Sequence, residues 1–185
     1  MNLKSIKLGP RWTLFALLAV CVLPVVAAYV AYYWLPPEGR THNGELLPPR
    51  PASLSRLSVQ NPAALSGRWL LVTVDSASCD APCQHKLWLM RQVRTAMGDK
   101  AHRVERLWLV TGDGEPDARL VQAFQGMQFA HVSADALEVF AADRPRADYI
   151  YLLDPRAQVI MRYVASEDPK GVIRDLERLL RYSSQ

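Results

Sequence analysis

The sequence lacks the motifs by which many enzymes and nucleotide-binding proteins are identified. It has no G-x-x-x-x-G-K-[ST] phosphate loop and no G-x-S-x-G turn around a nucleophilic serine, and its four histidines form no His-rich cage. Internal repeats are absent, and only three cysteines occur in 185 residues. The familiar motifs therefore give no support for nucleotide hydrolysis or serine-nucleophile catalysis, and the cysteines become the most informative residues.

An excess of positive charge is also absent once the N-terminus is set aside. The chain has 22 Lys and Arg against 18 Asp and Glu, and residues 1–35 hold three basic and no acidic residues. The remaining 19 basic and 18 acidic residues nearly cancel. Because nucleic-acid binding needs a basic footprint, we expect no nucleic-acid partner.

Residues 12–35 contain no charged side chain and are rich in Leu, Val and Ala. At about 1.5 Å per residue, this run is long enough to cross a hydrocarbon core of about 30 Å. Lys4, Lys7 and Arg11 precede it with no acidic residue among them, so the positive-inside rule predicts a cytoplasmic N-terminus at 1–11 and a single-pass anchor at 12–35. The alternative is a cleaved signal peptide, for which Ala28 and Ala31 resemble a cleavage site.

Past the anchor, a stretch rich in proline at 36–53 predicts an extended, semi-rigid tether. Residues 54–185 have the length of a single domain. In a bacterium this domain faces the periplasm, where disulfides persist. Cys21 lies within the apolar run, where a lone cysteine behaves as a small hydrophobic residue.

Apolar runs in the domain predict strands at 68–75, 106–111, 127–132 and 148–153, with a hairpin partner at 158–164. Helical spacing predicts helices that end at Gly98, begin at Pro116, follow Ser133 and follow Asp168. Short crossovers imply parallel pairing first, with the hairpin adding an antiparallel edge. The order is that of the thioredoxin-like α/β fold, a mixed sheet flanked by helices.

Cys79 and Cys83 lie at the turn between the first strand and the first helix, where this fold carries its chemistry. Two thiols there can form a disulfide, exchange one, or hold a soft metal ion. Because aligned backbone dipoles favour a thiolate at a helix N-terminus, we expect Cys79 to be the more exposed attacking residue and Cys83 its resolving partner.

Three stretches resemble the Sco/SenC family of copper-insertion factors for cytochrome oxidase assembly: the C-x-x-x-C of residues 79–83, the strand 107–111, and the strand and turn 149–155. The resemblance implies a membrane-anchored accessory factor of the bacterial inner membrane with a periplasmic domain. It also implies Cu(I) or thiols as the cargo, and a cytochrome oxidase subunit or other copper or thiol assembly factors as partners.

The chain departs from this family at two positions. Gln84 replaces the proline that usually follows the second cysteine, and Arg146 stands where the third copper ligand, a histidine, is expected. A guanidinium cannot donate a lone pair to a metal. We therefore take Cys79, Cys83 and His85 as the candidate metal ligands, with other substitutes for the third position at His131, Met127 and Met161.

Two other interpretations of the cysteine pair remain open. One is a periplasmic thiol–disulfide oxidoreductase, the single enzymatic activity that the sequence supports, in which Cys79 and Cys83 are the redox-active pair. The other is a non-catalytic interaction module with a structural disulfide. An arginine near the pair, such as Arg146, would favour a thiolate, although this arginine also fits a solvated charged loop.

Overall fold

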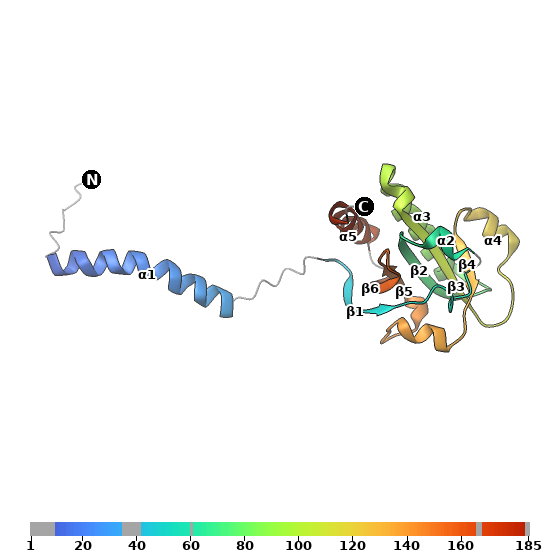
Figure 1. Ribbon diagram of the computed structural model, residues 1–185, viewed down its shortest axis with the longest axis horizontal. Coiled ribbons are helices and arrows are strands. Elements are labelled where there is room, and N and C mark those ends of the chain that lie inside the picture. The colour runs from blue at the N-terminus through green and yellow to red at the C-terminus, as the bar shows by residue number, and fades with distance from the viewer. Residues whose placement is uncertain (1–9, 35–41, 60, 166–167, 184–185) are drawn as a thin grey trace. The chain divides into compact units, whose positions relative to one another are not determined.

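The structure is a computed structural model that describes residues 10–34, 42–59, 61–165 and 168–183. The chain forms two compact units, 1–41 and 42–185 (Figure 1). The first unit contains helix α1 (Pro10–Trp34), in which Leu14–Ala31 is long and apolar enough to cross a membrane. The predicted anchor is thus a helix that could span a bilayer, and Leu35 lies outside the described residues.

The second unit is built on a six-stranded mixed sheet in the order β1-β6-β5-β2-β3-β4. Its strands are β1 (Glu45–Pro51), β2 (Trp69–Ser76), β3 (Val104–Thr111), β4 (Gln128–His131), β5 (Tyr149–Leu153) and β6 (Gln158–Val164). The β2-β3 and β3-β4 pairs are parallel, whereas β5 runs antiparallel to β2 and β6. This architecture confirms the predicted thioredoxin-like class and places β2 in the interior of the sheet.

Helices and short turns cover both faces of the sheet (Figure 1). Helices α3 (Ala81–Ala96) and α5 (Pro169–Tyr182) bury apolar side chains such as Met90 and Leu176 against one face. The opposite face is covered by α2 (Pro62–Leu65), η2 (Asp135–Val139) and the segments around them. The remaining elements are η1 (Gly98–Arg103), α4 (Ala118–Ala123) and η3 (Arg146–Asp148).

Capping residues determine where the two long helices of this unit begin. The carboxylates of Asp80 and Asp168 each accept a hydrogen bond of 3.0 Å, from the N–H of Cys83 and Lys170 respectively. A proline in the first turn follows each cap, where the missing N–H would have had no helical partner. After α3, Gly98 adopts a φ of +56°, which glycine reaches without strain.

The predicted tether at 36–53 requires a correction. Residues 45–51 form β1, which pairs antiparallel with β6, so the folded unit begins near Asn43 and not at residue 54. Prolines are tolerated in β1 because it is an edge strand, where a missing N–H breaks no ladder on the solvent side. Residues 36–41 lie outside the described residues.

Three other expectations differ from the structure. The hairpin is not the edge of the sheet, because β5 pairs with β2 and β1 covers the outer side of β6. The helix expected from Pro116 is only the six residues of α4, which Asp117 caps and Phe124 ends by leaving helical geometry. The segment after Ser133 is the 3₁₀ turn η2 in place of an α-helix.

Candidate functional site

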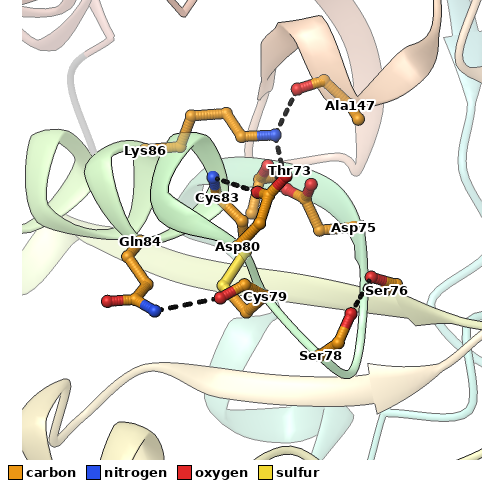
Figure 2. Close-up of a disulfide and its surroundings, with 10 residues drawn as sticks. All are labelled: Thr73, Asp75, Ser76, Ser78, Cys79, Asp80, Cys83, Gln84, Lys86 and Ala147. Atoms are coloured by element: carbon orange, nitrogen blue, oxygen red, sulfur yellow. Dashed lines mark hydrogen bonds and ion pairs between the residues drawn. A yellow bond between two sulfur atoms is a disulfide. The ribbon is translucent and has the colours of Figure 1, made fainter.

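A disulfide joins Cys79 and Cys83 at the start of α3, directly after β2 (Figure 2). Their Cα atoms are 5.1 Å apart. Cys79 has a φ of +36°, a left-handed conformation that non-glycine residues seldom adopt. The structure therefore brings together the two cysteines that the sequence singled out.

Hydrogen bonds hold the turn that contains the disulfide (Figure 2). The Cys79 N–H donates to the Ser76 carbonyl at 3.2 Å, and the Gln84 side-chain amide donates to the Cys79 carbonyl at 3.0 Å. Asp80 accepts from the Cys83 N–H and so caps α3 at the same point. Both ends of the five-residue loop are thus fixed to backbone groups.

Both cysteines are buried, each with 1% of its surface exposed. They pack against Leu87, Trp108 and Val110. Ala77 and four partly buried residues from α4, β4 and the segment between them complete this cluster, and we call the latter four the cover: Leu120, Phe124, Met127 and Phe129. The prediction that Cys79 is the more exposed residue is therefore wrong for this oxidised form, because the cluster encloses both cysteines.

The cover is imperfectly packed. A cavity of about 10 Å³ lies between its members and Trp108. The indole Nε1 of Trp108 is buried and has no hydrogen-bond partner among the described residues. Because an unpaired buried N–H costs about 1–3 kcal/mol, displacement of the cover, which admits water to Trp108, would recover part of that cost.

A buried ion pair lies beside the same turn. Lys86 Nζ is 2.5 Å from Asp75 Oδ2, and the two side chains are 3% and 9% exposed. Lys86 also donates to the Ala147 carbonyl, and the Thr73 hydroxyl donates to Asp75 at 3.1 Å (Figure 2). Burial raises the pKa of Asp75, and the Lys86 ammonium opposes that rise.

Asp75 and Lys86 are site residues that sequence reasoning missed. Asp75 is the next-to-last residue of the mainly apolar strand β2, and Lys86 lies between Cys83 and Met90 on the buried side of α3. A charged residue at a core position of two adjacent elements requires a buried partner of opposite sign. That rule is the signal by which the pair could have been predicted.

The structure does not bring the other candidate metal ligands to the sulfurs as a set. His85 is exposed, and its ring stacks on Trp88 with the centroids 5.7 Å apart. It lies two positions after Cys83, about 200° further around the helix. His131 Nε2 is 3.3 Å from Glu115, and Met161 is buried in the cluster between the sheet and α5. No three His, Cys, Asp or Glu residues of the described chain are arranged to hold a metal ion.

The loop that carries Arg146 faces the start of α3 across a cavity of about 260 Å³, whose lining includes Pro82, His85 and Arg144 but neither cysteine. Arg146 Nε donates to the Phe140 carbonyl at 3.0 Å. Burial raises the pKa of nearby Tyr151 to about 12, and the Arg146 charge opposes that rise. The guanidinium is therefore fixed to the backbone of its own loop.

Comparison with known proteins gives one family match. Residues 69–183 match the family model described as a transmembrane-like, thioredoxin-like, C-terminal domain. No curated protein matches the sequence.

Solved structures with the same fold include copper-bound yeast Sco1, which is 14% identical with a TM-score of 0.55 over 65% of this chain and 82% of that one. Apo Sco1 from Thermus thermophilus is 15% identical, with a TM-score of 0.55 over 76% and 99% of the two chains. A SCO1/SenC family lipoprotein from Bacillus anthracis is 13% identical, with a TM-score of 0.51 over 75% and 94%. The predicted resemblance to Sco/SenC proteins is confirmed at the level of the fold.

Proposed function

Because the chain belongs to the transmembrane-like, thioredoxin-like C-terminal domain family, we propose that it is a membrane-tethered thiol–disulfide factor of Sco-like fold. One observation carries the proposal. The Cys79–Cys83 disulfide lies at the end of β2 and the start of α3, where thioredoxin-like folds carry a reactive dithiol. Its partner is a protein thiol, and the Sco-like resemblance makes the copper-site cysteines of a cytochrome oxidase subunit or an assembly factor the first candidates.

The exchange transfers two electrons between the protein and its partner. A partner thiolate attacks one sulfur, the Cys79–Cys83 bond breaks, and its electron pair leaves on the other cysteine as a thiolate. A second partner thiolate then attacks the mixed disulfide, which releases the partner oxidised and both cysteines reduced. In the reverse direction the reduced pair reduces a partner disulfide. In this scheme Cys79 is the sulfur that the partner attacks, and Cys83 is the resolving cysteine that leaves as the thiolate.

The membrane helix sets the location in this proposal. Helix α1 anchors the chain in a bacterial inner membrane, with residues 1–11 in the cytoplasm and the folded unit in the periplasm. The cover leaves the disulfide closed until a partner displaces it. A partner that binds beside α4 can both open the cover and supply the thiolate.

Copper handling is the second candidate, favoured by the likeness to copper-bound Sco structures. When reduced, Cys79 and Cys83 supply two soft thiolates that suit Cu(I). His85 stacks on Trp88 and Arg146 cannot coordinate a metal, whereas the thioether of Met127 packs in the cysteine cluster. Copper as cargo would therefore be held by the two thiolates with Met127 or a ligand from the partner.

Reduction potential and exchange kinetics test the thiol proposal on the full chain. We expect a potential above about −300 mV and exchange with a small thiol, and we expect the Cys83→Ser variant to form a mixed disulfide with its partner through Cys79. A potential below about −300 mV with unreactive sulfurs would identify a structural disulfide and exclude the proposal. For copper, retention of Cu(I) by the reduced chain against a mild chelator is measured in wild type, His85→Ala and Arg146→His.

A further inference from the structure

A row of exposed cations follows α5 on the side opposite its buried apolar stripe. The members are spaced by three or four residues and so share one side of the helix: Lys170, Arg174, Arg178 and Arg181. Four exposed cations stand against two exposed carboxylates on this helix and its cap, because Asp175 is buried and only Glu177 and the cap Asp168 are exposed. Helix α5 therefore presents a cationic stripe to solvent.

A cationic hollow adjoins the end of this stripe. Its volume is about 690 Å³, and none of the described residues that line it is acidic. The basic residues of its lining are Arg68, Lys100, His102, Arg103 and Arg181. Arg181 belongs to both features, so we call the stripe and the hollow together the cationic face. Glu105 offsets the charge of Arg68, whereas Arg103 is held in place by a 2.9 Å hydrogen bond to the Leu180 carbonyl.

The chain enters the folded unit at this same face. Arg174 Nη2 donates to Asn43 Oδ1 at 3.1 Å, and the Asn43 N–H donates to Asp175 at 2.7 Å. Residues 35–42 separate α1 from Asn43 and can extend over at most about 30 Å at 3.3–3.6 Å per residue. A folded unit tied to a bilayer by so short a segment has its cationic face within reach of lipid headgroups.

We propose that the cationic face binds anionic lipid headgroups at the membrane surface. The inference rests on the proposed membrane anchoring by α1. Guanidinium groups such as those of Arg174 and Arg181 donate paired hydrogen bonds to phosphate oxygens, and Lys170 and Lys100 add point charges. The attraction is screened by salt, and each cation removed weakens binding about fivefold.

Lipid binding at the cationic face does not block the approach of a protein partner to the disulfide. The hollow is lined by residues that directly precede β2, such as Arg68, whereas Cys79 follows the end of β2 at Ser76. The eight residues of β2, at about 3.3 Å each, separate the two sites by about 26 Å. The face that binds lipid and the site that exchanges thiols therefore lie at opposite ends of the sheet.

The test uses the full chain in nanodiscs of phosphatidylcholine alone or with about 30% phosphatidylglycerol. Amide hydrogen exchange of α5 and η1 should slow at least fivefold in the anionic discs and return to its original rate in 0.5 M salt, about the level at which surface charges are screened. The variant Arg174→Gln/Arg178→Gln/Arg181→Gln should lose the protection. A matched variant with the same charge change elsewhere, Arg119→Gln/Arg144→Gln/Arg156→Gln, should keep it.

Equal exchange in both lipids, or protection that persists in the α5 variant, would overturn the proposal. Protection in phosphatidylcholine discs on addition of glycerol phosphate alone would show a soluble-phosphate site in place of a lipid surface, and would also overturn it. If the chain does not co-elute with the discs, membrane anchoring by α1 is contradicted, whereas lipid binding by the cationic face is not. Sedimentation of that chain with anionic but not zwitterionic vesicles would then support the proposal, and no sedimentation would refute it.

Discussion

Lys86 Nζ lies 2.5 Å from Asp75 Oδ2, and both side chains are buried where α3 crosses the end of β2. The disulfide fastens the same turn three residues earlier in α3, at Cys83. A charge buried alone costs far more than one buried with its partner. The position of the first turn of α3 therefore depends on the charges of Asp75 and Lys86 together.

Removing one charge of this pair should destabilise the protein strongly. In Lys86→Met, the buried Asp75 carboxylate loses its cationic partner and keeps the Thr73 hydroxyl as a donor, and the free energy of unfolding should fall by about 3–5 kcal/mol at pH 7. The double variant Asp75→Leu/Lys86→Met should recover most of the loss. Urea denaturation measures both, with the exposed Lys170→Met as a control that should change stability by under about 0.5 kcal/mol. Equal losses in the single and double variants would contradict the coupling.

The pH dependence of the unfolding free energy of Lys86→Met should report the protonation of the Asp75 carboxyl. Burial already raises the pKa of this carboxyl, and loss of Lys86 should raise it further. A carboxyl with a raised pKa holds its proton more tightly in the folded state, so stability falls as pH rises from the ordinary value of 3.8 through the raised pKa. The loss in Lys86→Met should therefore be smaller near pH 4 than near pH 7, by comparison of unfolding curves. Asp75→Asn/Lys86→Met should not show this slope.

The cover should control the reactivity of the disulfide. Phe124 packs over the cysteine cluster, and the Arg91 guanidinium lies 5.3 Å from its ring centroid. Phe124→Ala should speed reduction by dithiothreitol about tenfold, because local opening needs less free energy than global unfolding. Arg119→Ala, an exposed change on the helix α4 that precedes Phe124, should leave the rate unchanged. If Leu137→Ala on the opposite face accelerates reduction equally, access follows global unfolding and not the cover.

Loss of the disulfide should cost little stability. The crosslink closes a loop of only five residues, for which loop entropy predicts a contribution on the order of 2 kcal/mol. Cys79→Ala/Cys83→Ala should therefore remain folded with an unfolding free energy lower by about that amount, as measured by chemical denaturation. A loss above about 5 kcal/mol would identify the disulfide as a main structural element and weaken the exchange proposal.

Asp175 should fix the start of the folded unit. Its carboxylate accepts from the N–H groups of Asn43 at 2.7 Å and Gly44 at 3.0 Å, and from the Tyr163 hydroxyl at 3.4 Å. Asp175→Asn weakens these charge-assisted bonds, so we expect a loss of about 2 kcal/mol and faster amide exchange in β1. Glu177→Gln, two positions further along α5 on its exposed side, is the matched control. Unchanged amide exchange in β1 would show that pairing with β6 holds this strand in place without the Asp175 carboxylate.

Much of the fold was predictable because its signals are local. The hairpin partner at 158–164 was predicted with its observed bounds, since Asp154 and Pro155 mark the turn before it. Strand β1 was missed because Pro48, Pro49 and Pro51 indicate an extended spacer when only their local propensity is considered. Its pairing with β6 joins residues more than a hundred positions apart, and no local pattern reports that.

The sequence by itself determined an apolar helix long enough to cross a membrane, the placement of two cysteines four positions apart after an apolar strand, and the end of α3 near Gly98. These follow from hydrophobic period and capping, which act within a few residues. Only the tertiary structure decided that the cover encloses both sulfurs and that Lys86 reaches Asp75 and, across 61 positions, Ala147. Burial and charge pairing depend on which distant segments pack together, so the closed, ion-paired state of the site could not be read from its own residues.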